Sequence, residues 1–177
     1  MAPRPSKKLD TDGVWGAKSQ AMLDYVVGIS ATGWSGTVSG SFDKAYKKMA
    51  GMARLGLQNY LNRFRPTWQY VYLGSIWGIE SMAKLDVDGV WGSATSNALT
   101  NFICRCLGCK YSSGGKTGTN MAGGWGGVSG FSVSYIYETA SIKDVQKFLN
   151  AAYEGKKLNP HPEHANYGDS LVPPRWT

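Results

Sequence analysis

Several residue types on which hydrolases rely are scarce in this 177-residue chain. The chain has two histidines, His161 and His164, and both stand in a proline-broken stretch near its end. A zinc hydrolase takes its ligands from ordered elements, and a glycosidase needs two carboxylates across a cleft. Of the four glutamates, only Glu80 stands in a suggestive aromatic setting. We therefore expect no catalytic part, and Glu80 remains the weak alternative as the acid of a small muramidase.

Long apolar runs are also missing from the chain. No stretch approaches the ~20 apolar residues that span a bilayer. The first eight residues are polar and contain Pro3 and Pro5, so they lack the apolar region of a signal peptide. We expect synthesis in the cytoplasm, no membrane insertion, and release by another agent if the protein acts outside the cell.

Cysteine is limited to Cys104, Cys106 and Cys109. Three thiolates could bind a metal ion with one further ligand. Buried free thiols on a helix are the favoured interpretation, because a free cysteine behaves as a small hydrophobic residue. We expect no metal and no cofactor.

The acidic pairs Asp10/Asp12 and Asp86/Asp88 raise the question of calcium. A calcium loop of the EF-hand type would need a further acid where Lys8 and Lys84 stand. The aspartates are therefore interpreted as turn and helix-capping residues.

Glycine, aromatic residues and positive charge are abundant instead. There are 23 glycines, 22 aromatic residues and a net charge of +7. Aromatic rings on glycine-rich loops suit the C–H faces of sugars, although the same rings could fill two small cores. A basic chain attracts polyanions such as the teichoic acids of a Gram-positive wall. Nucleic acid is a distant alternative, because the basic residues form isolated pairs, and we expect no nucleic-acid partner.

The chain contains an internal duplication. Residues 8–16 reappear as residues 84–92, with eight of nine positions identical. Two further landmarks follow in the same order in each copy, residues 33–40 matching 124–130 and residues 57–62 matching 145–150. Three ordered landmarks predict two copies of one structural unit.

These landmarks define the predicted organisation. The segments are an N-terminal tail (1–7), repeat 1 (8–62), an aromatic connector (63–83), repeat 2 (84–153) with an inserted loop near 104–120, and a proline-rich extended tail (154–177).

Local patterns predict a mainly α fold. Asp-Gly marks a turn in which glycine supplies a positive φ, and a helix follows each turn. Helical runs are expected at residues 17–27, 41–61, 93–103 and 140–153. We therefore expect two tandem small helical modules with ordered glycine-rich loops and allow for short β segments.

The repeated loop resembles that of the peptidoglycan-binding domain 1 family. Residues 12–16 and 88–95 are similar to its Asp-Gly-φ-aromatic-Gly-x-x-Thr loop, with Ser19 in the place of the threonine in the first copy. Leu57-Gln58 and Val145-Gln146 are similar to its φ-Gln-x-φ-Leu helix. One departure is that the glutamine expected shortly before the second loop is missing from residues 78–84. The resemblance implies wall binding, as in the C-terminal region of phage endolysins.

The candidate ligand-binding residues lie in the repeated loops. Trp34 and Trp125 are flanked by glycines and are predicted to be stacking platforms, with Ser39 and Ser129 as hydrogen-bonding neighbours. For Trp15 and Trp91 the core is favoured over ligand contact. The turn residues Asp12 and Asp88 complete the set.

The leading hypothesis is non-catalytic binding of peptidoglycan or an associated wall polysaccharide, which targets a lysin catalytic domain to its substrate. The alternatives are a small muramidase-like hydrolase and a phage structural protein that uses the fold for contact with the host wall.

Overall fold

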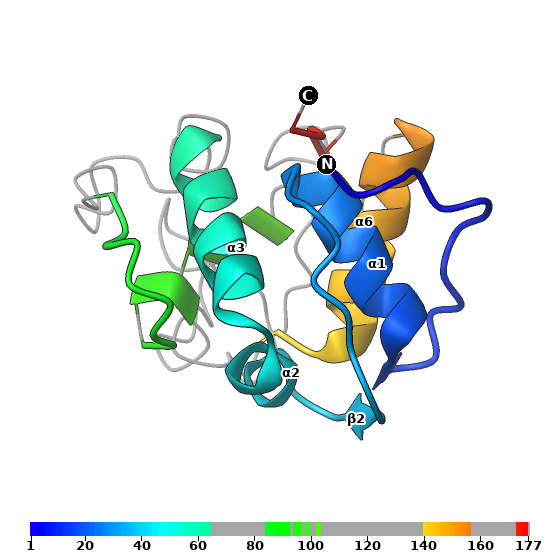
Figure 1. Ribbon diagram of the computed structural model, residues 1–177, viewed down its shortest axis with the longest axis horizontal. Helices are drawn as coiled ribbons and strands as arrows, with labels where there is room; N and C mark the ends of the chain where they lie inside the picture. Colours follow the sequence, from blue (N-terminus) through cyan, green and yellow to red (C-terminus); the bar gives the residue numbers. More distant parts are fainter. Residues whose placement is uncertain are drawn as a thin grey trace, which may run out of the picture.

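The protein is mainly helical, as the sequence predicts. A computed structural model describes residues 1–64, 84–92, 94–96, 98–99, 102–103, 140–156 and 173–176 (Figure 1). Residues 94–96, 98, 99, 102 and 103 are also helical, within the run expected at 93–103. The named elements are β1 (Val14–Trp15), α1 (Ala17–Val27), β2 (Val38–Ser39), α2 (Phe42–Lys48), α3 (Gly51–Arg63) and α6 (Ile142–Glu154), and β1 pairs antiparallel with β2.

Helix α1 has the predicted bounds. It begins directly after Gly16 and ends at Gly28, which adopts a left-handed conformation with φ of 79°. The Gly28 N–H donates to the carbonyl of Asp24 and closes the last turn. Its buried face includes Met22, Leu23 and Val26, which are at most 1% exposed.

The run predicted at residues 41–61 is not one helix but two. Met49 and Ala50 separate α2 from α3 and have extended ψ angles of 154° and 148°. Met49 is buried, so its side chain holds the corner against the core. The period of the apolar residues does not reveal this break, because both helices direct their apolar faces at the same core.

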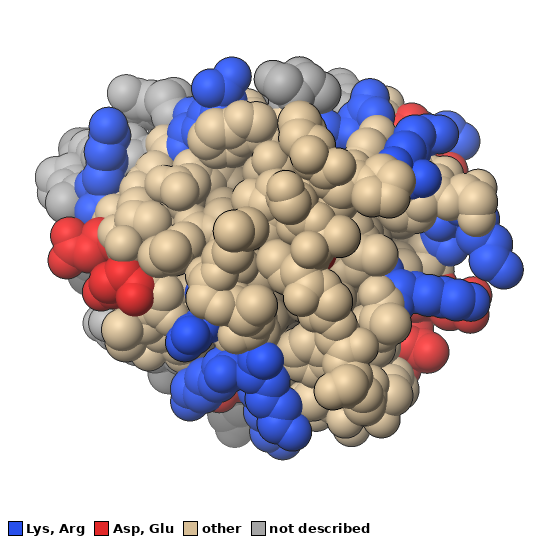
Figure 2. Space-filling view, in the orientation of Figure 1, with Lys and Arg blue, Asp and Glu red and all other residues tan. Residues whose placement is uncertain are grey.

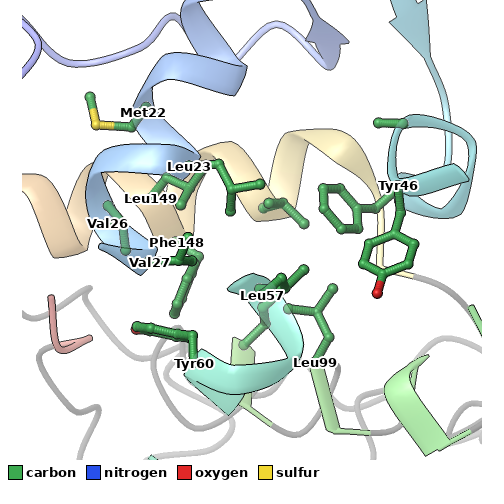
Figure 3. Packing of buried hydrophobic residues seen from close by; sticks show 14 of the residues in the cluster. Met22, Leu23, Val26, Val27, Tyr46, Leu57, Tyr60, Leu99, Phe148 and Leu149 are labelled. Carbon is green, nitrogen blue, oxygen red and sulfur yellow. The ribbon is translucent and has the colours of Figure 1, made fainter. Parts of the chain in front are cut away.

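One continuous core joins the two repeats (Figure 3). Helices α1 and α6 lie side by side, and α3 also packs against α1 (Figure 1). Residues of α1, α3 and α6 point toward one another in the close-up, together with Leu99 of repeat 2. The labelled members of this core are Met22, Leu23, Val26, Val27, Tyr46, Leu57, Tyr60, Leu99, Phe148 and Leu149.

The two repeated tryptophans meet the same residue of α2. The ring of Trp15 lies 5.3 Å from that of Phe42, and the ring of Trp91 lies 6.0 Å from it on an equivalent edge-on approach. Phe42 is fully buried. It therefore connects the loop of repeat 1 to the loop of repeat 2.

The end of the chain packs onto the helices. The backbone N–H of Trp176 donates to the Val26 carbonyl at 2.9 Å, and the Tyr60 hydroxyl donates to the Pro174 carbonyl at 2.6 Å. A Cβ on Gly28 would lie only 2.9 Å from the Trp176 ring, so glycine is needed there for close packing as well as for its positive φ. None of the helices in the described ranges is long and apolar enough to cross a membrane.

Candidate functional site

The loop of repeat 1, residues 10–16, is held by a side chain from the far end of the sequence. The Gly13 N–H donates to Oε1 of Gln146 at 2.9 Å. The Gln146 amide nitrogen donates to the Val14 carbonyl at 2.9 Å and to the Ser19 hydroxyl at 3.1 Å. Gln146 is 1% exposed. A buried amide that satisfies both its donor and acceptor groups fixes the loop in one conformation.

The loop of repeat 2, residues 86–92, is held in the same way by α3. The Gly89 N–H donates to Oε1 of Gln58 at 2.8 Å, and the Gln58 amide nitrogen donates to the Val90 carbonyl at 3.2 Å and the Thr95 hydroxyl at 3.1 Å. Residues 78–84 do contain no glutamine, and the loop takes this contact from another part of the chain. Gln58 supplies it from 31 residues before Gly89, well outside the stretch in which it was sought.

An asparagine one turn further along each helix fixes the segment before each loop. Asn150 accepts from the Leu9 N–H at 2.7 Å and donates to the Leu9 carbonyl at 2.8 Å. Asn62 makes the same two bonds with Leu85, at 2.7 and 3.0 Å. The closing helix of each repeat therefore clamps the loop of the other repeat, and the two repeats are interlocked.

Asp12 and Asp88 stabilise the turns that contain Gly13 and Gly89. Oδ1 of Asp12 accepts from the Val14 N–H at 3.0 Å, and Oδ1 of Asp88 accepts from the Val90 N–H at 2.9 Å. These backbone hydrogen bonds favour the charged form and lower the pKa of both carboxyl groups below the ordinary value. The interpretation of both residues as turn aspartates is confirmed, whereas the helix-capping role is not seen at α1, which begins after Gly16 with no side-chain cap.

The lowered pKa values predict how stability changes in acid. A carboxyl group whose pKa is lower in the folded state contributes stability above its unfolded pKa, about 4, and loses it as the pH falls through the folded value. The double variant Asp12→Asn/Asp88→Asn keeps an acceptor oxygen but has no charge. We expect it to be less stable than the natural protein at pH 7, and we expect the difference to shrink as the pH falls below the unfolded pKa of about 4. Urea unfolding across this range checks the prediction, and a difference that does not depend on pH would contradict it.

A small hollow lies over the loop of repeat 1. It has a volume of about 270 Å³, and Asp12, Lys18 and Gln146 are among the residues that line it. The hollow combines an exposed carboxylate with a cation beside a rigid backbone. The turn that carries Trp34 passes close to this loop. The carbonyl oxygen of Gly36 lies 3.9 Å from the position that a Cβ on Gly16 would occupy.

Trp34 lines a larger, open hollow of about 680 Å³. Its ring is half-buried and packs partly against the core, and its Nε1–H donates to the Gly36 carbonyl at 3.1 Å. The ring is therefore fixed on one side and open to the hollow on the other. The lining residues are Thr32, Gly33, Trp34, Ser35, Lys48, Met49 and Ala50.

A buried polar network that sequence reasoning missed supports the Trp34 turn. Nε1–H of Trp15 donates to Gln20 at 3.1 Å, and the Gln20 amide donates to Asp24 at 2.9 Å. Asp24 then accepts from the backbone N–H of Thr32 at 2.8 Å and from its hydroxyl at 2.9 Å. Both Gln20 and Asp24 are 1% exposed. The sequence did contain a signal for this network, because Gln20 and Asp24 are polar residues four positions apart on the apolar face of a predicted helix.

The structure separates the other predicted site residues. Trp15 is fully buried, so it belongs to the core, and Trp91 is half-buried with its ring 4.8 Å from that of Tyr46. Ser39 is exposed and pairs opposite Val14, and it does not line the Trp34 hollow. Trp15 is thus a core residue, as favoured, Trp91 lies at the edge of the core, and Ser39 does not lie beside Trp34 in its hollow. The predictions for Trp125, Ser129, Glu80, Cys104, Cys106 and Cys109 fall outside the described residues.

Two further observations concern metal binding and known relatives. In the part of the chain that the structure describes, no group of three histidine, cysteine or acidic residues could hold a metal ion. Comparisons with protein-family models, curated proteins and solved structures find no match to this chain.

Proposed function

We propose that the protein is a non-catalytic binding module for the bacterial cell wall that targets a lytic enzyme to peptidoglycan or an associated wall polysaccharide. Its two peptidoglycan-binding-type units are each assembled from both repeats. The observation that carries the proposal is the open hollow in which the half-buried Trp34 ring is held by a fixed turn. The buried Asp24 carboxylate holds Thr32, which lines the same hollow.

The chemistry of the Trp34 hollow suits a wall glycan. The apolar face of a pyranose packs on an indole ring, and the ring pays little entropy because it is already fixed. Ser35 and Lys48 are exposed on the lining of the hollow. A hydroxyl can bind sugar hydroxyl groups, and the Lys48 ammonium can attract the carboxylates of peptide stems. A shallow hollow of this kind favours binding over a reaction that needs exclusion of water.

Duplication strengthens binding to a repetitive polymer. A second modest site on the same chain rebinds at high effective concentration and raises avidity without new contacts. Trp125 is the proposed second platform and falls outside the described residues.

Replacing Trp34 with alanine is expected to weaken binding to purified sacculi by about tenfold, because the stacking surface is lost. Co-sedimentation with sacculi measures the change. Trp34→Phe is the matched control, since it retains an aromatic face and should keep most of the affinity. Unchanged binding by Trp34→Ala would remove the platform from the proposal.

A release assay separates binding from hydrolysis. Sacculi incubated with the protein should release no reducing ends, whereas a muramidase would release them and lose this activity on Glu80→Gln. Release that depends on Glu80 would overturn the proposal in favour of an enzyme.

A further inference from the structure

Arginine and aromatic side chains gather where the two ends of the chain meet. The Arg4 guanidinium lies 4.3 Å from the centre of the Tyr153 ring, and Arg63 lies 4.7 Å from that of Trp176. Nη1 of Arg175 donates to the Tyr25 hydroxyl at 2.6 Å. Figure 1 marks both termini at this end, and basic side chains recur along the same edge in Figure 2.

Arg4 and Arg175 lie over two neighbouring rings, those of Tyr153 and Tyr25. Burial alone raises the pKa of Tyr25, but hydrogen bonds and positive charge from Arg175 and Arg4 outweigh it and lower the pKa. Tyr25 is half-buried and its ring lies 6.2 Å from that of Tyr153. The two packed rings therefore support the two guanidinium groups in a defined position. Two like charges on neighbouring rings repel each other, and an anion bound between them relieves the repulsion.

No carboxylate of the described residues neutralises these arginines. The ion pairs in those ranges are made by three lysines: Lys8 and Lys156 with Glu154, and Lys47 with Asp43. A guanidinium that stacks on a ring uses its face, and its N–H groups point outward in the plane. The cluster therefore presents oriented donors at an exposed position, and no carboxylate in the described ranges compensates its positive charge.

We propose that Arg4 and Arg175, held on Tyr25 and Tyr153, form a binding site for the phosphodiester groups of an anionic wall polymer. The planar guanidinium fork matches two phosphate oxygens, and charge-assisted bonds of this type are the strong ones. The inference rests on the proposed function for its choice of polymer and adds a ligand class distinct from the sugar at Trp34. Nucleic acid carries the same group, but a paired contact at one point lacks the long basic stripe that tracks a duplex.

The test uses the full chain and a fluorescently labelled poly(glycerol phosphate), with binding followed by anisotropy. The natural protein should bind, and Arg4→Gln/Arg175→Gln should bind about tenfold or more weakly with a smaller salt dependence. The matched control is Lys44→Gln/Lys47→Gln on α2, which removes the same charge at the opposite end of the view in Figure 1 and should change affinity less than about twofold. Thermal melting of both variants checks that they are folded.

Three results would overturn the proposal. They are no binding of the polymer by the natural protein, equal weakening by both double variants, and tighter binding of duplex DNA of equal phosphate content through the same two arginines. Sacculus binding by Trp34→Ala is read separately. If Trp34→Ala loses binding to sacculi while Arg4→Gln/Arg175→Gln binds the polymer as tightly as the natural protein, the proposed function stands and this inference fails. If the natural protein binds the polymer but not sacculi stripped of it, the inference stands and the peptidoglycan function fails.

Discussion

Replacing Gln146 with alanine is expected to lower the free energy of unfolding by about 3 kcal/mol. The change removes an amide that is 1% exposed and leaves the Gly13 N–H and the Val14 carbonyl without their partner. Polar groups left unsatisfied in a buried setting each cost about 1–3 kcal/mol.

Urea unfolding of the Gln146→Ala variant measures this loss. Lys147→Ala is the control on the next position of α6, which is exposed, and it should change stability by less than about 0.5 kcal/mol. The equivalent variant Gln58→Ala should show a loss of similar size, because Gln58 makes the same set of contacts with the other loop. A loss below about 1 kcal/mol for Gln146→Ala would show that the clamp is not important for the fold.

Local structure was predictable from the sequence where the signal is local. The bounds of α1 follow from Gly16 and Gly28, which flank a run of apolar residues at helical spacing. The positive φ of Gly13 and Gly89, 78° and 74°, follows from the Asp-Gly turn signal in each repeat. The short pair of β1 with β2 was allowed for but not placed, since two-residue strands carry no periodicity of their own.

The pairing of helices with loops was not predictable from the repeats. The chain contains two equivalent loops and two equivalent glutamines, and either assignment satisfies the same hydrogen bonds. Reading along the chain favours the partners within one repeat, whereas Gln146 lies 133 residues from the glycine that it holds. Only the packing of α6 beside α1 selects the partner, and this contact depends on the whole core.

In the candidate site, too, local features were predictable and features that depend on tertiary contacts were not. Glycine neighbours distinguished Trp34 from the buried Trp15, because the tight turn places one ring at the surface and the other in the core. The polar network through Gln20 and Asp24 was missed because its acceptor, Thr32, lies in an irregular segment that no sequence period describes.

Residues 1–64, which contain the whole of repeat 1, are expected not to fold on their own. The fragment lacks Gln146 and Asn150, and with them the bonds that hold Gly13 and Leu9. It also lacks the buried apolar face of α6. We expect no cooperative unfolding transition and water-exposed tryptophan fluorescence, because the loss of one element of a shared core removes most of a stability of about 5–15 kcal/mol.

Restoring α6 at the other end of the fragment is expected to rescue it. The end of α6 lies beside the start of the chain, where the Tyr153 hydroxyl donates to the Pro5 carbonyl at 2.8 Å and Glu154 lies 4.0 Å from Lys8. A chain in which residues 140–156 precede residues 1–64 through a short Gly/Ser linker therefore places the helix against its natural loop. It should regain a cooperative urea transition and a buried Trp15, whereas the same chain with Gln146→Ala and Asn150→Ala should not. A cooperative transition in the fragment of residues 1–64 alone would mean that repeat 1 folds as an independent module. The clamping of its loop by α6 would then add no stability.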